Sequence, residues 1–291
     1  MTYAETIQFL YDLRLFGLKL GLDNVVRLAT LAGRPQDRLR FVHVAGTNGK
    51  GSTCAMLEGI YRAAGLKVGL FTSPHLVSFR ERIQVDRRLI TEEAVVRLVD
   101  ELRAGLRDFP ADHHPTFFEV VTVLALRHFA EQQCDLVVWE TGMGGRLDAT
   151  NIVDPLASLI TNIQFDHQKW LGSTRTEIAA EKAGIIKPGV PVLTTTDDPD
   201  ALAVIERTAR EKQAPLTVLG PERVKREWPA DRPLALLGEH QKVNAALALG
   251  AVEALATQIP VSAAAGRQGL GSVRWPGRLQ KVELPGGRVA L

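Results

Sequence analysis

The segment from His43 to Cys54, HVAGTNGKGSTC, decides the fold of this 291-residue chain. It holds three glycines, one lysine and three hydroxyl residues in twelve positions, and it overlaps and follows the apolar run Phe41–Val44. Such a segment has few side chains that could pack in a core. We therefore predict that a strand ends at this point, that a helix begins near Ser52, and that the residues between them form a loop with a binding role.

The composition of this loop favours a phosphate group as its ligand. Its glycines let the backbone turn with positive φ, and the N-terminus of the following helix offers unpaired N–H groups and the positive end of the helix dipole. Lys50 would supply charge to the terminal phosphates, and the Ser52 hydroxyl would bind magnesium. The match to G-x-x-x-x-G-K-[ST] is imperfect, because Val44 replaces the first glycine and Gly51 separates Lys50 from Ser52. The alternative is a glycine-rich turn with an exposed lysine.

The overall composition is that of a globular protein. With 45% hydrophobic and 23% charged residues the chain can build one large domain or two, and a net charge of +2 is too small to indicate a nucleic-acid partner. Cys54 and Cys134 form neither a disulfide framework nor a metal-ligand spacing, which is typical of a reducing compartment. The first twenty residues include Glu5 and Asp12 and lack the apolar core of a signal peptide or membrane span. We therefore expect a cytoplasmic protein without a membrane partner.

One local basic group interrupts this balance of charge. It consists of Arg80, Arg82, Arg87 and Arg88. Such a group is most often a solvated face, but it is also suited to contact an anionic substrate. The sequence leaves both interpretations open.

Short β-rich runs alternate with helical patterns from residue 40 onward, which predicts an α/β fold with a mostly parallel, doubly wound sheet. Thr91 and Thr116 are predicted helix N-caps. Residues 1–39 are expected to form a helical preface within the large domain, residues 40–291 the phosphate-loop domain, and residues 280–291 a hairpin around Pro285-Gly286-Gly287. We predict strands at Phe41–Ala45, Lys67–Thr72, Leu136–Glu140, Ala157–Asn162, Val190–Thr195, Leu216–Leu219 and Leu234–Leu237, and helices at Ser52–Ala64, Thr91–Leu106, Phe117–Gln132, Thr176–Gly184, Pro199–Lys212 and His240–Ala256.

Three polar groups follow predicted strands, at the edge of the sheet where doubly wound folds bind their ligands. Ser73 follows KVGLFT, Glu140 ends DLVVWE, and Asp166-His167 comes just after SLITNIQF. A carboxylate at such a strand end, beside a phosphate loop, is typical of a magnesium site. The alternatives are a plain turn residue at Ser73, before Pro74, and a helix cap or surface histidine at His167.

Three further segments carry candidate site residues. ETGMGGRLDATN, residues 140–151, is too polar for a core and too specific in composition for a linker, so we expect it to line a site. TFFE, residues 116–119, has the capping-box pattern and needs no ligand to explain it. Lys182, within EKAGIIK, lies near the end of a short predicted helix, where a lysine favourably opposes the helix dipole. That pattern alone predicts a surface position for Lys182.

Seven motifs occur in order along the chain: HVAGTNGKGS, TSPHL, TFFE, GGRLDATN, the run from FDH through LG and IA to EKAGIIKPG, GEHQ with a following NA, and WPGR. Together they resemble the folylpolyglutamate synthase and dihydrofolate synthase branch of the Mur ligase superfamily, from about Gly17 to the last residue. The resemblance implies a Mur ligase ATP-binding domain and an ATP-dependent amide ligation in folate biosynthesis. A substrate carboxylate would attack the γ-phosphate, an acyl phosphate would form, and the amino group of L-glutamate would displace phosphate. The acceptor would be dihydropteroate, a (tetrahydro)folyl-polyglutamate or both.

The resemblance also implies roles for individual residues. Lys50, His167 and Lys182 would be catalytic. ATP would be bound by Thr47, Asn48, Gly49, Lys50, Gly51 and Ser52 of the loop, with Asn244 and Arg278 as further contacts. Two Mg²⁺ ions would be held by Ser52, Ser73, Glu140, His167 and Lys182, the lysine carbamylated on its side-chain nitrogen and therefore not at the surface. The pteridine substrate would contact Gly21, Leu22, Asp23 and Asn24, then Thr116, Phe117, Phe118 and Glu119, and finally Leu147, Asp148 and Ala149.

Other functions remain open at this point. Peptidoglycan Mur ligases carry a nucleotide-sugar domain ahead of the loop, whereas only 45 residues precede Gly46 here. A simple NTPase would not need GGRLDATN or EKAGIIK, and a non-catalytic nucleotide-binding module could keep the same fold. In the family, a smaller C-terminal domain beginning with Asp-Gly-Ala-His-Asn follows the stretch equivalent to residues 288–291. We therefore expect a chain that lacks this domain, keeps the fold and some MgATP affinity, and ligates glutamate poorly or not at all. We also expect a monomer.

Overall fold

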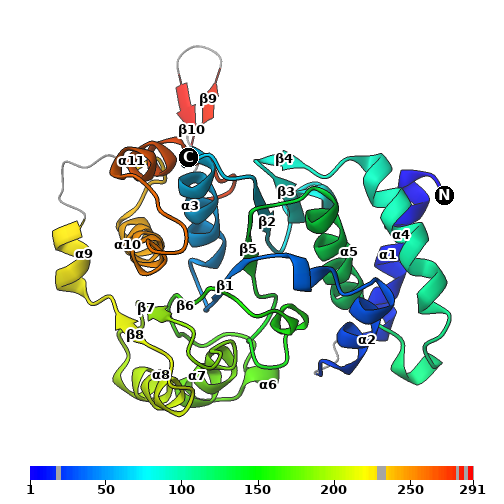
Figure 1. Cartoon of the computed structure of the whole chain (residues 1–291), viewed down its shortest axis with the longest axis horizontal. Helices are drawn as coiled ribbons and strands as arrows, with labels where there is room; N and C mark the ends of the chain where they lie inside the picture. The colour runs from blue at the N-terminus through cyan, green and yellow to red at the C-terminus, as the bar shows by residue number, and fades with distance from the viewer. Residues whose placement is uncertain (18–20, 228–233, 280–281, 285–287, 291) are drawn as a thin grey trace.

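An eight-stranded mixed sheet forms the centre of the molecule (Figure 1). The computed structural model describes residues 1–17, 21–227, 234–279, 282–284 and 288–290. The sheet order is β4-β3-β2-β5-β1-β6-β7-β8, parallel from β2 to β8 and antiparallel at the edge formed by β3 and β4. The predicted α/β fold with a mostly parallel sheet is therefore confirmed. The strands are β1 Phe41–Ala45, β2 Val68–Phe71, β3 Ile83–Val85, β4 Arg88–Leu89, β5 Leu136–Glu140, β6 Ala157–Ile160, β7 Val192–Thr194 and β8 Leu216–Val218.

Helices cover both faces of this sheet (Figure 1). One face packs against α1, α2, α4 and α5 near β1, β2 and β5, and against α7 and α8 near β6 and β7. The other face packs against α3, α10 and α11. The helices are α1 Tyr3–Asp12, α2 Asp23–Leu31, α3 Lys50–Ala63, α4 Glu92–Leu106, α5 Phe117–Glu131, α6 Gln168–Leu171, α7 Arg175–Ala183, α8 Pro199–Glu211, α9 Pro221–Glu227, α10 Glu239–Ala254 and α11 Ala263–Ser272.

Buried side chains of the central strands alternate between the two faces. In β5, Leu136 and Val138 join the core beneath α3, whereas Val137 and Trp139 join the core beneath α5. Successive strand residues point to opposite faces, so a strand covered on both sides must be apolar at every position. This explains why the central strands read as continuous apolar runs in the sequence.

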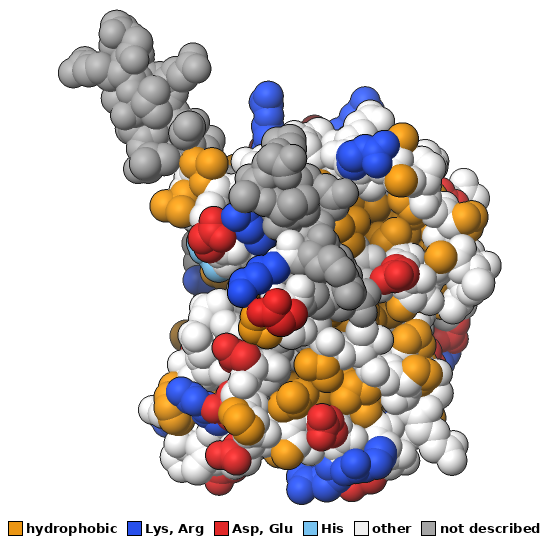
Figure 2. All heavy atoms as spheres, turned by 90° about the vertical axis from the view of Figure 1, so that its left-hand side faces the viewer, with side chains coloured by type: hydrophobic (Ala, Val, Ile, Leu, Met, Phe, Trp, Pro, Cys, Tyr) orange, Lys and Arg blue, Asp and Glu red, His pale blue; other side chains and the backbone are white. Residues whose placement is uncertain are grey.

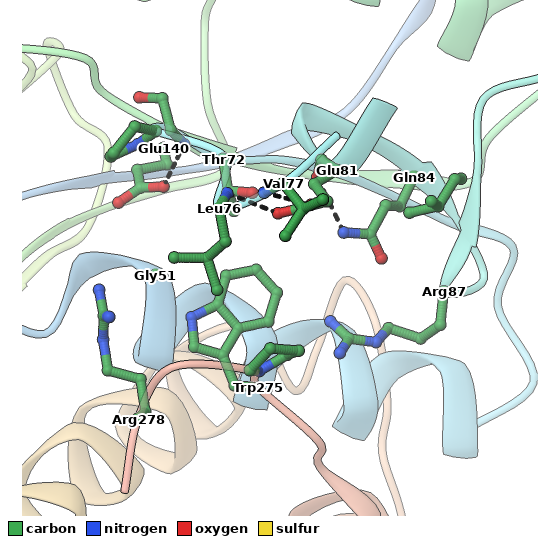
Figure 3. Close-up of a pocket in the computed structure, with 14 residues that line it drawn as sticks. Gly51, Thr72, Leu76, Val77, Glu81, Gln84, Arg87, Glu140, Trp275 and Arg278 are labelled. Carbon is green, nitrogen blue, oxygen red and sulfur yellow. Dashed lines mark hydrogen bonds between the residues drawn. The ribbon is translucent and has the colours of Figure 1, made fainter. Parts of the chain in front are cut away.

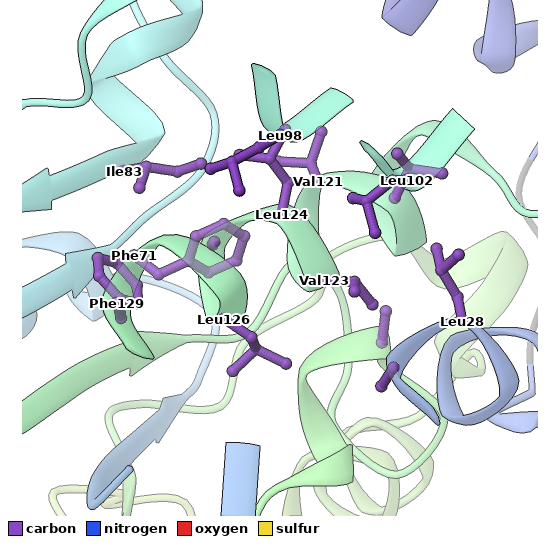
Figure 4. Packing of buried hydrophobic residues seen from close by; sticks show 14 of the residues in the cluster. Leu28, Phe71, Ile83, Leu98, Leu102, Val121, Val123, Leu124, Leu126 and Phe129 are labelled. Carbon is purple, nitrogen blue, oxygen red and sulfur yellow. The ribbon is translucent and has the colours of Figure 1, made fainter. Parts of the chain in front are cut away.

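The core beneath α5 is large and aromatic (Figure 4). The rings of Phe71 and Trp139 stack with centroids 4.4 Å apart, and Phe129 of α5 meets Trp139 edge to face at 6.3 Å. Residues 1–39 contribute to the same core, because α2 places Leu28 beside the side chains of α4 and α5 (Figure 4). The N-terminal helices therefore pack on the sheet domain rather than apart from it.

Both predicted helix caps are present. The Thr91 hydroxyl accepts a hydrogen bond from the Ala94 N–H at 3.1 Å. Thr116 and Glu119 form the complete capping box predicted from TFFE, with the Glu119 carboxylate accepting from the Thr116 N–H at 2.7 Å. Each cap satisfies helix N–H groups that have no partner within the helix.

One predicted strand is wrong, and the strands β3 and β4 and the helices α6, α9 and α11 were not predicted. Leu234–Leu237 is an irregular segment leading to α10, and its apolar character is explained by burial of Leu236 in the core beneath α3. The edge hairpin β3–β4 escaped prediction because it is very short and turns through Asp86 and Arg87, both at positive φ, instead of an Asn-Gly pair. The helices α9 and α11 were also missed, and α11 contains three glycines that lower its intrinsic helix propensity.

The predicted C-terminal hairpin is confirmed where the structure describes it. β9 (Val282–Leu284) and β10 (Arg288–Ala290) pair in antiparallel fashion. The predicted turn residues 285–287, together with residues 280, 281 and 291, lie outside the described residues.

Within the described part of the chain, no helix is long and apolar enough to cross a membrane. On the face that carries α9 and α10, Lys and Arg side chains are interspersed with Asp and Glu (Figure 2). This face therefore has no field of a single sign, in agreement with the small net charge of +2.

The contact between α3 and α11 yields a test of the packing. A Cβ atom on Gly269 would lie 2.5 Å from the Ile60 Cα and 2.6 Å from the Gly59 carbonyl oxygen, whereas a Cβ on Gly271 would meet nothing within 4 Å. Gly269→Ala should lower the free energy of unfolding by about 1–3 kcal/mol through overpacking. Gly271→Ala should leave it unchanged or raise it by up to about 1 kcal/mol through helix propensity. Urea unfolding of both variants measures the difference, and equal stabilities would contradict this packing.

Candidate functional site

The phosphate loop connects β1 to α3, as predicted. Gly46 and Gly49 both have positive φ, at 142° and 87°. A side chain on Gly46 would overlap the Thr161 hydroxyl, and one on Gly49 would overlap the Asn244 carboxamide. Glycine is therefore required at both positions by conformation and by space.

The loop is held in place by the segment that follows β6. The Thr47 N–H donates to the Asn162 carbonyl and the Asn48 N–H donates to Asn162 Oδ1, both at 2.8 Å. These two amides are thus already used. The N–H groups left to bind an anion are those from Gly49 to Ser52, where α3 begins and its first amides have no acceptor within the helix.

Two lysines converge on one carbonyl oxygen in this loop. Lys50 Nζ donates to the Gly46 carbonyl at 3.0 Å and to the Thr47 carbonyl at 3.1 Å, and Lys182 Nζ donates to the same Gly46 carbonyl at 2.8 Å. Lys182 is 2% exposed, so the surface position predicted from the helix pattern alone is wrong. Burial, with the nearby charge of Lys50, lowers the pKa of Lys182 to about 7.

Ser73 and Glu140 meet at the carboxyl ends of β2 and β5. The Ser73 N–H donates to Glu140 Oε2 at 2.9 Å. Glu140 is 3% exposed, and burial raises its pKa to about 7 against the opposing effects of Lys50 and the Ser73 N–H. Ser52, the other predicted hydroxyl ligand, is also buried. The site therefore presents a buried carboxylate that no cation of the described residues pairs with at ion-pair distance.

His167 lies at the rim of the site. It occupies the N-cap position of α6 with a φ of 47°, its side chain is 55% exposed, and its Nε2 is 3.5 Å from Asp166 Oδ1. Among the residues that the structure describes, no three His, Cys, Asp or Glu side chains gather closely enough to hold a metal ion by themselves. The structure thus joins Ser73 to Glu140 by a hydrogen bond, whereas no hydrogen bond among the described residues links His167 to either of them.

A first cavity of about 460 Å³ lies beside the phosphate loop (Figure 3). Gly51, Ser73, Glu140 and Arg278 line it, four residues that were predicted to contact ATP or metal. The indole of Trp275 forms a wall against the loop, because a Cβ on Gly51 would lie 3.2 Å from Trp275 Nε1. The remaining lining residues include Leu76, Val77, Gln84 and Arg87, which sequence reasoning did not assign.

Asn244, another predicted ATP contact, does not line the first cavity but lies against the loop. Its carboxamide adjoins Gly49, and its Nδ2 donates to Gln241 Oε1 at 2.9 Å. Asn244 on α10 thus lies against the loop at Gly49, directly before α3 begins.

A second cavity of about 430 Å³ adjoins the first and shares Ser73 and Pro74 with it. Of the predicted pteridine contacts, Gly21, Thr116, Phe117, Phe118, Glu119, Leu147, Asp148 and Ala149 line this cavity, and His167 lies at it as well. Leu22, Asp23 and Asn24 do not. Asp23 and Asn24 begin α2, and Leu22 packs on the core beneath α5. Three segments far apart in sequence thus meet at one cavity.

The basic group noted in the sequence divides between several environments. Arg82 lines the second cavity and Arg87 lines the first. Arg80 donates to the Ile90 carbonyl at 2.6 Å, and Arg88 is exposed on the edge strand β4. The group is neither one solvated face nor one binding patch, because Arg80 and Arg82 belong to the short 3-10 helix Phe79–Arg82, whereas Arg87 and Arg88 belong to the hairpin β3–β4.

The residues of the second cavity that were missed include Arg14, Gly17, Gly142 and Met143. Gly142 and Met143 belong to the glycine-rich segment that was expected to line a site. Arg14 has no local signal of this kind, because its position depends on how the N-terminal helices pack on α5.

Comparison with known proteins gives consistent matches. Residues 44–232 match the model of the Mur ligase middle domain. The chain is 39% identical over 303 aligned positions to the Bacillus subtilis dihydrofolate synthase/folylpolyglutamate synthase, covering 97% of this chain and 70% of that protein. It superposes on an FPGS–AMPPCP–folate complex with a TM-score of 0.87 and 34% identity, covering 97% of this chain and 74% of that one. It superposes on E. coli FolC in complex with DHPP and ADP with a TM-score of 0.81 and 35% identity, covering 95% of this chain and 68% of that one.

The buried carboxyl group predicts a pH-dependent stability in the absence of nucleotide and divalent cations. Between pH 4.5 and 7 the folded chain keeps the proton on Glu140 while the unfolded chain releases it. Stability is therefore lost as the pH rises through this window, by up to about 3 kcal/mol. Glu140→Gln has no proton to lose at this position. The free energy of unfolding of this variant, relative to that of the wild type, should therefore rise by roughly the same amount as the pH increases through the window. Urea unfolding in EDTA over a pH series measures it, and a difference independent of pH would refute it.

Proposed function

Since this chain belongs to the folylpolyglutamate synthase/dihydrofolate synthase family of Mur ligases, we propose that it takes part in the ATP-dependent ligation of L-glutamate to the carboxylate of dihydropteroate or of a reduced folate. The observation that carries the proposal is the pair of adjoining cavities that meet at Ser73, one beside the phosphate loop and one lined by the predicted pteridine contacts. A solved family member contains an ATP analogue and folate together, and another contains DHPP and ADP.

The proposed reaction has two steps. A carboxylate oxygen of the acceptor attacks the γ-phosphorus of ATP, and the bond from this phosphorus to the β,γ-bridging oxygen breaks. ADP leaves, and the acceptor becomes an acyl phosphate. The glutamate amino nitrogen then attacks the acyl carbon, the carbon–oxygen bond to phosphate breaks, and inorganic phosphate and the amine proton are released. The protein's task is to hold the reactants in line and to stabilise phosphate charge.

In this proposal the N–H groups from Gly49 to Ser52 and the ammonium of Lys50 hold the phosphates. Lys50 is already directed into the loop by the Gly46 and Thr47 carbonyls. Asn244, which adjoins Gly49, and Arg278 at the first cavity would contact the remainder of the nucleotide.

The donor set beside this loop fits magnesium. Glu140 is a carboxylate whose pKa is raised by burial, and the hydroxyls of Ser52 and Ser73 supply neutral oxygen. Magnesium ordinarily uses one or two carboxylates together with phosphate and water, so a larger protein cage is not needed. When bound with ATP, the ion would offset phosphate charge. His167, at the rim, is the proposed ligand of a second ion.

We further propose that Lys182 is carbamylated. Only a neutral amine reacts with CO₂, forming an N–C bond and releasing a proton, and the lowered pKa of Lys182 makes that form available near neutral pH. The product is an anion, which would remove the repulsion between Lys182 and Lys50 at the Gly46 carbonyl and supply oxygens toward the second ion.

A cytoplasmic location and a monomeric state stay predictions. The free, buried cysteines Cys54 and Cys134 agree with a reducing compartment. Light scattering of the purified chain measures its mass directly.

The proposed function predicts two dependences. MgATP should bind the wild type, and Lys50→Met should weaken this binding at least tenfold, because it removes a charge-assisted contact to phosphate. Lys212→Met changes an exposed position after α8 and should leave MgATP binding unchanged. Titration calorimetry measures both.

Phosphate release should require L-glutamate and either dihydropteroate or tetrahydrofolate. Release without an acceptor would indicate an NTPase, and MgATP binding without any release a non-catalytic module.

Carbamylation of Lys182 predicts a carbonyl signal of a carbamate in ¹³C NMR when the chain is equilibrated with ¹³C-bicarbonate. Lys182→Met should abolish the signal. Lys187→Met is the matched control, because Lys187 is also partly buried with a lowered pKa but donates to the Asn151 carbonyl away from the phosphate loop. A signal that persists in Lys182→Met would disprove the assignment.

A further inference from the structure

Two arginines, Arg14 and Arg82, line the second cavity. Arg82 is 6% exposed, and Arg14 lies on the same cavity from the N-terminal segment. Within the described ranges, neither guanidinium forms an ion pair. Both approach the ring of Phe117, with Arg14 Cζ at 4.9 Å and Arg82 Cζ at 5.4 Å from its centroid. One aromatic ring is thus flanked by two positive charges.

The environment of Arg82 is unfavourable for an unpaired cation. Burial and the neighbouring charge of Arg14 lower its pKa to about 10. The carboxylates of Glu140 and Glu81 act on it only from beyond ion-pair distance. A buried charge without a counter-charge costs stability, and such groups in folded proteins are normally paired. The cavity in front of Arg82 is therefore suited to an anion.

Two nearby arginines, in contrast, each form an ion pair with a glutamate. Arg80 pairs with Glu92 and donates to the Ile90 carbonyl. Arg87 lies 3.8 Å from the buried Glu58 carboxylate and its Nη2 donates to the Arg274 carbonyl, while its buried Nη1 has no hydrogen-bond partner among the described residues. For Arg82, the described residues accept only from Nε, so its Nη1 and Nη2 groups are left for a ligand.

The side chain of Arg82 is also oriented. Its Nε–H donates to His75 Nδ1 at 2.8 Å. Since Nδ1 accepts, the ring proton of neutral His75 is on Nε2, which donates to the Tyr11 hydroxyl oxygen at 3.3 Å. The Arg82 carbonyl in turn accepts from the Thr72 N–H at 3.1 Å, next to Ser73. His75 and Tyr11 are thus positioning residues that direct the guanidinium.

We propose that Arg82 binds the carboxylate of the acceptor substrate, with Arg14 as a second cation in the same cavity. The inference rests on the proposed function and adds to it the group that recognises the acid. Because the cavity reaches Ser73, which it shares with the cavity beside the phosphate loop, a carboxylate held by Arg82 lies at the junction where it can meet the γ-phosphate. The guanidinium would also reduce repulsion between the two anions as they approach.

The test compares two ligands that differ in one group: dihydropteroate and its primary carboxamide. Fluorescence titration in the presence of Mg²⁺ and a non-hydrolysable ATP analogue gives the ratio of their dissociation constants. The wild type should prefer the carboxylate by roughly tenfold or more. Arg82→Gln should bring the ratio close to one, and Arg82→Lys, which keeps the charge, should retain part of the preference. Arg88→Gln, at the exposed edge strand, should keep the wild-type ratio.

His75 provides a second, independent comparison. His75→Asn keeps an acceptor near the position of Nδ1 and should keep the preference, whereas His75→Leu removes the acceptor and should reduce it. Nucleotide affinity, measured in the same samples, reports whether each variant is folded.

The outcomes separate the two levels of the proposal. A wild type that binds neither ligand would overturn the proposed function and this inference with it. If the wild type prefers the carboxylate and both Arg82→Gln and Arg82→Lys keep the wild-type ratio of dissociation constants, only the role of Arg82 is overturned. Loss of preference in Arg82→Gln with unchanged nucleotide affinity supports the role.

Discussion

The Gly46 carbonyl oxygen accepts hydrogen bonds from the ammonium groups of Lys50 and Lys182, and the functional site depends on this contact. Two cations on one oxygen repel each other, and the buried one is held there by the packing of α7. The loop cannot move away, because Gly46 packs tightly against Thr161. The loop is therefore fixed, with the ammonium of Lys50 directed into it, before any anion arrives, which is the preorganisation that phosphate chemistry requires.

The topology of the sheet places the other half of the site next to this charge. Parallel strands end at one edge, so β2 and β5 deliver Ser73 and Glu140 to the place where β1 delivers the phosphate loop. Ser73 belongs to both cavities and is the point where an acid from one side and a nucleotide from the other could meet. Buried groups of opposite charge, Glu140 and Lys182, each have a pKa moved toward neutrality by burial. Shifted pKa values of this kind are typical of functional sites, where buried ionisable groups bind ligands.

Much of the fold could be predicted because its signals are local. The central strands read as apolar runs, and the observed boundaries of β1 and β5 equal the predicted ones. The failures came where local signals mislead. Leu234–Leu237 is an irregular segment whose Leu236 is buried, and α11 is a helix in spite of its glycines, one of which, Gly269, lets it approach α3 closely. In each case tertiary packing overrode local propensity.

The sequence by itself determined the loop glycines, the caps at Thr91 and Thr116, and the alternation of buried faces in the strands. Each of these depends on residues within a few positions of one another. Only the tertiary structure decided the burial of Lys182, whose partner Gly46 is 136 positions away. The same holds for the orientation of Arg82 by a chain of contacts that reaches back to α1. Charge and burial at such positions arise from elements that meet only when the sheet closes around its helices, so no local pattern encodes them.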